Sequence, residues 1–380
     1  MRTIRDIDTN GSLENALVSI QGMAARKQDY LVDTNQLQFA SRALETAQPV
    51  ITMEQNHGEP TRRFAINDVC FDQIVNEAGI PVQYARRLLT DYPNELEDQV
   101  MAIWNNENKT RMLRTYEGTY DNTQREARAW VSNKFKTFDN TDMVETVIQP
   151  LIESEAQWEA VNTSITDKRM YLQFKSRRSV AEPALGDLMA LGLRITNSET
   201  GHGSVNINQM IFTLACLNGM QTAHTLRSIR RPHLGRRRDN EGMNILIQED
   251  TIAAQNQALK LEVRDIMQHV GDEQAFQETI QQMRIAHNRE IEGTPQEAVE
   301  RIGEILKLTK QETSSVLDGL IETFKQPGYT SGKISQATLV NSVTAIQHKA
   351  HDDDKGNWQR MGGKILELPR TQWEYIARAA

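Results

Sequence analysis

Residues 197–207 bring together residue types that occur in several kinds of active site. They read NSETGHGSVNI, so Gly201 and Gly203 flank His202, with Glu199 and Ser204 close by. Such residues can form a phosphate-binding glycine loop or the nucleophile and base of a hydrolase. The spacing fits neither, because no Gly-Lys-Ser/Thr follows, no third glycine opens a helix, and the nucleophile elbow G-x-S-x-G is absent. Alternation on both sides instead predicts the tip of a β-hairpin.

A second candidate for chemistry is His348-Lys-Ala-His351, which runs directly into three aspartates, Asp352–Asp354. Histidines at positions i and i+3 share one face of a helix, and neighbouring carboxylates are common metal ligands. No further Cys/His cluster completes a site in the sequence. A solvated helix end followed by an acidic loop is therefore the favoured interpretation, and no metal or other cofactor is predicted.

The charged residues are unevenly distributed along the chain. The net charge is −8, yet the segment from Lys109 to Arg238 has a balance of +6 and the remainder one of −14. No carboxylate occurs in residues 200–238. The end of this stretch holds six arginines: Arg227, Arg230, Arg231, Arg236, Arg237 and Arg238. Such a basic segment in an acidic chain favours contact with phosphates.

Several segments in the basic region have the period of two that is typical of strands. They are 110–116, 125–135, 169–177, 191–197 and 204–210, and turn-forming residues separate them. Alternation gives them an apolar face and a second face that mixes cations with aromatic rings. The residues expected on this second face are Arg128, Trp130, Lys134, Arg169, Tyr171, Lys175, Arg177 and Arg194. Cations that follow phosphates and rings on which bases stack are the groups that hold single-stranded nucleic acid.

These elements predict an α+β fold, with a central, mainly antiparallel sheet, packed helices, and helical N-terminal and C-terminal sections. The predicted boundaries are a helical section 1–105, a basic α+β core 106–240, an acidic helical region 241–326, and a linker with a C-terminal section 327–380. Within the acidic region, capping boxes at Thr294–Glu297 and Thr309–Glu312 predict a helical hairpin. A DNA-binding helix-turn-helix at 294–325 is disfavoured, because this segment contains six carboxylates and only four basic residues.

The remaining composition indicates a soluble, cytoplasmic protein. The N-terminus lacks an apolar signal sequence, and no apolar run approaches the roughly 20 residues that span a bilayer. The two cysteines, Cys70 and Cys216, are far apart in apolar contexts, which predicts buried thiols in a reducing compartment.

Four segments in order carry a family resemblance: AGIPVQYARRLL, RMLRTYEG, RAWVSNKFKTFDNTDMVETVIQPLIE and GLRITNSETGHGSVNINQMIFTLACLNGM. Over roughly residues 60–240 the chain resembles the phage and plasmid proteins grouped as domain of unknown function 932. This resemblance implies a phage or plasmid context in a bacterial host. The family has no established reaction or catalytic residues that could be carried over to this sequence. A more distant analogy, at the level of fold alone, is with phage single-strand annealing proteins of the RecT, Erf and Redβ kind.

Three hypotheses follow from the sequence. The first is a non-enzymatic, oligomeric protein that binds and anneals single-stranded DNA in recombination or replication. The second is a structural or protein-interaction module, whose sheet is covered by the acidic helices and whose arginines pair with carboxylates. The third is a metal-dependent enzyme that uses His348, His351 and the adjoining aspartates.

Overall fold

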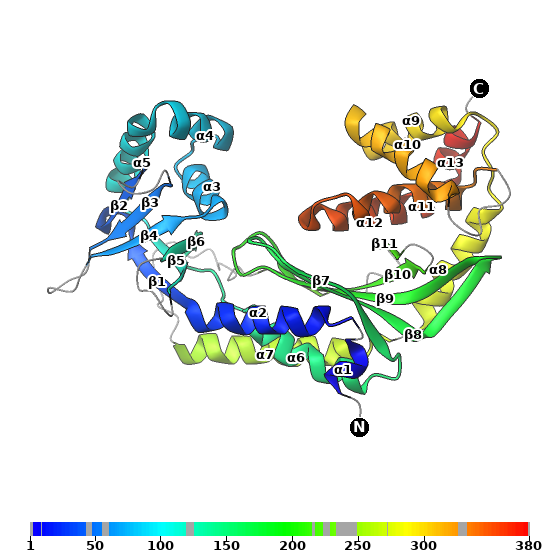
Figure 1. Cartoon of the computed structure of the whole chain (residues 1–380), viewed down its shortest axis with the longest axis horizontal. Helices are drawn as coiled ribbons and strands as arrows, with labels where there is room; N and C mark the ends of the chain where they lie inside the picture. The colour runs from blue at the N-terminus through cyan, green and yellow to red at the C-terminus, as the bar shows by residue number, and fades with distance from the viewer. Residues whose placement is uncertain are drawn as a thin grey trace, which may run out of the picture.

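The computed structural model describes most of the 380-residue chain. The described residues are 3–8, 10–42, 48–54, 61–118, 125–214, 217–222, 229–232, 249–271, 273–325 and 333–378. They form two six-stranded sheets with helices packed around them (Figure 1). All but one of the strand pairs are antiparallel, so the α+β fold predicted from the sequence is confirmed.

The first sheet has the strand order β1-β5-β6-β4-β3-β2. Its strands are β1 (Lys27–Asp33), β2 (Leu37–Ala40), β3 (Val50–Met53), β4 (Arg62–Ile66), β5 (Thr110–Tyr116) and β6 (Glu126–Ser132). Three helices accompany it: α3 (Asp68–Glu77), α4 (Val82–Asp91) and α5 (Pro93–Glu107). Phe64, Phe71 and Trp104 belong to a separate apolar core within this N-terminal lobe. The section to residue 105, expected to be mostly helical, thus contributes four of the six strands.

The second, central sheet is an antiparallel meander of the order β11-β10-β9-β8-β7. Its strands are β7 (Trp158–Ile165), β8 (Met170–Ala184), β9 (Asp187–Asn197), β10 (Ser204–Thr213) and β11 (Asn218–Met220), and β12 (Ile229–Pro232) also pairs with β10. In the register of β9 with β10, Ile195 lies opposite Ile207 and Leu193 opposite Gln209. This pairing confirms the predicted hairpin.

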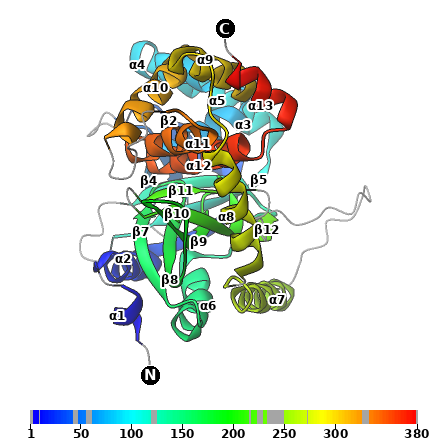
Figure 2. The same cartoon turned by 90° about the vertical axis from the view of Figure 1, so that its right-hand side faces the viewer.

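Helices cover both faces of the central sheet (Figures 1 and 2). Below it lie α2 (Ser12–Arg26), α6 (Asn140–Glu153) and α7 (Glu249–Met267), and the short α1 (Ile4–Ile7) adjoins them. Above it lie α11 (Gln336–Ala345) and α12 (Asp352–Leu366). The strands therefore carry apolar side chains toward one layer, such as Leu172 and Leu193, while polar side chains of the other face meet α12.

The remaining helices form a C-terminal lobe at the other end of the sheet (Figure 1). After α8 (Glu273–His287) come α9 (Pro295–Leu306), α10 (Lys310–Phe324) and, following α12, α13 (Arg370–Ala377); the 3-10 turns are η1 (Thr34–Gln36) and η2 (Ile346–His348). The two predicted capping boxes are confirmed, since Thr294 and Thr309 accept hydrogen bonds from the backbone N–H groups of Glu297 and Glu312. Within the described residues, each helix is too short or too polar to span a bilayer.

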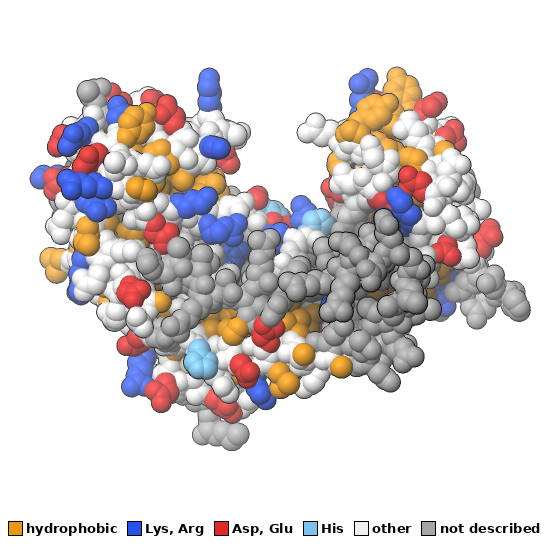
Figure 3. Space-filling view, turned by 180° about the vertical axis from the view of Figure 1, so that it is seen from behind, with side chains coloured by type: hydrophobic (Ala, Val, Ile, Leu, Met, Phe, Trp, Pro, Cys, Tyr) orange, Lys and Arg blue, Asp and Glu red, His pale blue; other side chains and the backbone are white. Residues whose placement is uncertain are grey.

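The surface is hollowed between the two lobes, above the central sheet (Figure 3). The hairpin loop between β9 and β10 reaches the N-terminal lobe, where the Gln73 side chain of α3 donates a hydrogen bond of 2.6 Å to the Thr200 carbonyl. The stretch whose residue types suggested a site therefore lies where the two sheets meet.

Candidate functional site

A fully buried arginine joins the hairpin loop to the N-terminal lobe. Arg114 of β5 is 0% exposed, and its Nη1 donates to the Glu199 carbonyl at 2.7 Å. Its Nε and Nη2 bind both carboxylate oxygens of Asp29, and Nη2 also donates to Asp139 at 2.8 Å. Lys27 adds a second cation to Asp139. Because these charges are buried and mutually hydrogen-bonded, they fix the geometry of the junction.

Glu199 is the acidic residue of the hairpin loop, and both its carboxylate oxygens have partners. One accepts from Arg128 Nη1 at 2.7 Å, and the other from the backbone N–H of Asn140, the first residue of α6, at 2.6 Å. Burial acts to raise the pKa of Glu199, but the charge of Arg128, the Asn140 hydrogen bond and the charge of Arg114 outweigh it and lower the pKa. The carboxylate is therefore an ionised structural anchor at neutral pH.

The other polar residues of the loop also serve the turn. His202 Nδ1 lies 3.1 Å from the Thr200 carbonyl, and burial lowers the pKa of this imidazole. The backbone carbonyl of His202 accepts a hydrogen bond from Arg169 Nε at 2.8 Å. Gly201 has a φ of +77°, which a residue with a side chain rarely adopts, so the glycine is explained by backbone geometry. Glu199 and His202 are thus engaged in separate contacts, and the hairpin interpretation accounts for them.

The predicted face of cations and rings is divided between two sheets. Arg128 and Trp130 lie in β6 of the N-terminal lobe, whereas Tyr171 and Arg194 lie in the central sheet. Trp130 is 4% exposed and stacks on Trp104, with 5.3 Å between the ring centroids. Its indole N–H donates a hydrogen bond to Glu77. The expectation of one continuous sheet face is therefore corrected.

Helix α12 covers the central-sheet part of that face. Tyr171 is 3% exposed and donates its hydroxyl to Asp353 at 2.7 Å. Arg194 is 5% exposed, lies 5.0 Å from the centre of the Tyr171 ring and donates to Gln359. Burial lowers the pKa of Arg194 to about 10. Since both rings expected to stack on bases are buried, neither offers a free face in this structure.

The remaining predicted residues are nearer the surface. Lys134 is exposed, and Arg169 is half-buried. Lys175 and Arg177 approach the same carboxylate, that of Glu159, at 3.7 and 2.9 Å.

The structure describes the arginine-rich segment only in part. Arg230 and Arg231 lie in β12, opposite Asn206 and Val205 of β10. Arg227, Arg236, Arg237 and Arg238 lie outside the described residues.

The two histidines of the metal hypothesis have separate structural roles. His348 Nε2 lies 2.7 Å from Asn218 Oδ1 of β11. His351 is the N-cap of α12, and its ring accepts from the Asp353 backbone N–H at 3.3 Å. Across the described ranges, no three His, Cys, Asp or Glu residues are grouped so that they could hold a metal ion.

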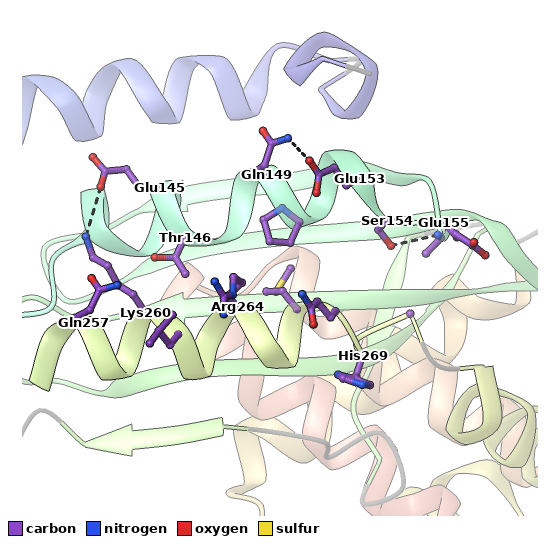
Figure 4. A pocket seen from close by; sticks show the side chains of 16 residues that line it. Glu145, Thr146, Gln149, Glu153, Ser154, Glu155, Gln257, Lys260, Arg264 and His269 are labelled. Carbon is purple, nitrogen blue, oxygen red and sulfur yellow. Dashed lines mark hydrogen bonds and ion pairs between the residues drawn. The ribbon is translucent and has the colours of Figure 1, made fainter. Parts of the chain in front are cut away.

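A groove between α6 and α7 forms a recess that was not predicted from the sequence. Its volume is about 860 Å³, and Lys260 reaches from α7 to Glu145 of α6 at 3.6 Å (Figure 4). Lys260 also binds Asp142 at 2.7 Å. Leu261 and Met267 supply apolar surface beside these charges. The groove combines groups of both signs and apolar side chains, without an arrangement typical of a catalytic site. The amphipathic pattern of 251–270 indicates the helix, but not which side of it is left open.

Comparison with known proteins supports the family resemblance. A family model described as Domain of unknown function (DUF932) matches residues 127–302. The match runs from β6 to α9 and includes the hairpin loop, Arg128 and the central sheet. No curated protein and no solved structure matches the chain. The DUF932 match therefore covers the meander and its junction with the N-terminal lobe, and it leaves β1–β5 outside.

Proposed function

We propose that this protein binds single-stranded DNA without catalysing a reaction on it. The observation that carries the proposal is the position of β12, which brings Arg230 and Arg231 into the edge of the central sheet, beside the hairpin loop. These two residues belong to a segment with six arginines in residues 226–238 and no carboxylate. Arginines suit the phosphates of a nucleic acid strand, because a guanidinium can donate two hydrogen bonds to one phosphate group.

The burial of Trp130 and Tyr171 restricts the form of this proposal. The proposed DNA binding therefore does not include base stacking on those rings, and it depends on contacts with phosphates. Binding should then depend little on base sequence and strongly on salt, because each neutralised phosphate releases counterions. If all six arginines contact phosphates, log K falls with log salt with a slope of about −4, at roughly −0.7 per contact for single strands.

Fluorescence anisotropy of a labelled oligonucleotide over a salt series tests the proposal. Arg230→Glu with Arg231→Glu should weaken binding and reduce the slope by about 1.4. The matched control is Arg370→Glu with Arg378→Glu, which makes the same charge change on exposed residues of the C-terminal lobe. No binding at low salt, or equal binding by both double variants, would refute the assignment of this segment.

The proposal extends to annealing in phage or plasmid recombination or replication, by an oligomer in the bacterial cytoplasm. Light scattering with and without DNA measures the oligomer, and the pairing rate of two complementary labelled strands measures annealing. A monomer that leaves this rate unchanged would restrict the function to binding alone.

A second candidate function is a protein-interaction module. It is favoured by the internal pairing of several described basic residues, such as Arg128 with Glu199 and Arg177 with Glu159. The salt series separates the two candidates, because a module that contacts only protein should leave DNA unbound at the lowest salt concentration.

A further inference from the structure

A small cavity lies at the junction of the N-terminal lobe and the central sheet. Its volume is about 40 Å³, which holds on the order of three water molecules at about 14 Å³ each. Its lining includes Tyr116, Arg128, Asn140, Lys168, Arg169 and Glu199. These residues come from β5, β6, the start of α6, the β7–β8 turn and the hairpin loop. The cavity exists only because the two sheets meet here.

Arg128, one of the residues that line this cavity, has unsatisfied donors. Its side chain is 4% exposed, and Nη1 is occupied by Glu199 and, at 3.3 Å, by the Tyr116 hydroxyl. Its Nε and Nη2 are buried and have no hydrogen-bond partner. Because leaving buried N–H groups of a charged side chain without acceptors is costly, this edge of the guanidinium calls for an acceptor.

The free edge of Arg128 has the geometry that binds two oxygens at once. Nε and Nη2 lie on the same side of a guanidinium, which forms paired hydrogen bonds with carboxylate or phosphate. Arg114, on the adjacent strand, uses the same two nitrogens to hold Asp29, at 3.0 and 2.9 Å. In Arg128 that edge is buried and has no protein acceptor, and Arg128 is one of the residues that line the cavity.

The charges around the cavity favour an anion. Three cations line it, Arg128, Lys168 and Arg169, against the two carboxylates of Asp167 and Glu199. Both oxygens of Glu199 are already engaged by the protein. Lys168 is exposed in the β7–β8 turn, so one side of the cavity adjoins solvent.

We propose that this cavity binds a single phosphate group, with Arg128 Nε and Nη2 as the paired donors and Lys168 as a second cation. The volume is too small for a sugar or base, which restricts the ligand to one small oxyanion. The phosphate can belong to a nucleic acid strand or to a free small phosphate, since the site recognises the group they share. This inference does not depend on the arginine-rich segment.

Isothermal titration with inorganic phosphate, at constant ionic strength against chloride and acetate, tests the inference directly. Arg128→Lys keeps a cation beside Glu199 but lacks the paired donors, so phosphate binding should weaken tenfold or more. Lys168→Gln, at an exposed position, should weaken it severalfold without threatening the fold. Arg370→Gln, an exposed residue of the C-terminal lobe, is the matched control and should bind as the original protein does.

Failure to bind phosphate above the chloride and acetate baselines would overturn the inference. Phosphate binding by Arg128→Lys and Lys168→Gln that is as tight as in the original protein would also overturn it. Competition between inorganic phosphate and a labelled oligonucleotide then identifies the source. Displacement of DNA, together with weaker DNA binding by Arg128→Lys, supports a nucleic acid phosphate; phosphate binding without displacement supports a free phosphate. If the protein binds inorganic phosphate but not DNA, the proposed function is refuted while the inference of a phosphate site stands.

Discussion

Replacing Arg114 tests whether the buried charge network holds the hairpin loop against the N-terminal lobe. Arg114→Gln removes the guanidinium that binds Asp29 and Asp139 and donates to the Glu199 carbonyl at 2.7 Å. Removing one partner of a buried ion pair typically costs about 3–5 kcal/mol, because the other charge stays buried without compensation. Lys27 still neutralises part of Asp139, so we expect a loss near the lower end, about 3 kcal/mol.

The assay is urea unfolding followed by tryptophan fluorescence, since Trp104 and Trp130 report on the N-terminal lobe and Trp158 on the central sheet. Arg370→Gln removes an equal charge from a side chain that is 86% exposed, and should change stability by no more than about 0.5 kcal/mol. A loss below about 1 kcal/mol for Arg114→Gln would refute the reasoning, because it would mean that the buried carboxylates need no cation.

Further predictions concern packing, pH and the buried ring. In Gly363→Ala the new Cβ would lie 1.8 Å from the Gln221 carbonyl oxygen, so the free energy of unfolding, measured by thermal unfolding, should fall by about 1–3 kcal/mol. Gly22 lies within α2 with open space around it, so Gly22→Ala should raise the free energy of unfolding by up to about 1 kcal/mol in the same measurement. The lowered pKa of Glu199 contributes stability above its unfolded-state pKa that is lost as pH falls through the folded value, so Glu199→Gln should flatten the acid side of a stability–pH curve. Trp130→Ala should cost about 3–5 kcal/mol by unfolding titration, while DNA affinity per folded molecule stays unchanged because the ring is buried.

Local alternation was sufficient to predict β8, β9 and β10 of the central sheet and the hairpin that joins β9 to β10, but not β7, β11 or β12. Leu193, Ile195 and Ile207 recur with a period of two, and all are 0% exposed in the sheet. The capping boxes at Thr294 and Thr309 were equally readable, because the cap and its partner are three residues apart. These features depend on neighbours in sequence, which is why one chain sufficed to find them.

The strands of the first hundred residues were missed for the opposite reason. β2 and β3 are each four residues long, too short for a clear period, and β1 pairs with β5, more than 70 residues later. A strand of this kind is stabilised by its partner strand and by the lobe's core, and its own sequence says little about either.

The polar face of the central sheet shows how far alternation can be taken. The pattern placed Tyr171 and Arg194 on one side of the sheet correctly, since Tyr171 pairs with Thr196 and Gln173 with Arg194. It could not tell whether that side meets water or protein, and Asp353 and Gln359 of α12, more than 150 residues away, cover it. A mixed face of cations and rings is therefore evidence for a second surface, and not by itself for a nucleic acid site.

The hairpin loop acquires a different importance once the two sheets are in place. Its glutamate binds Arg128 and the start of α6, its carbonyl binds Arg114, and Thr200 contacts the N-terminal lobe. The loop thereby holds Arg128 by Nη1 and leaves Nε and Nη2 without a protein acceptor, at a residue that lines the cavity. A glutamate that only neutralised Arg128 could lie on either edge of the guanidinium; because this one binds Nη1 alone, the edge suited to paired hydrogen bonds has no protein acceptor, which is the basis for proposing a second oxyanion there.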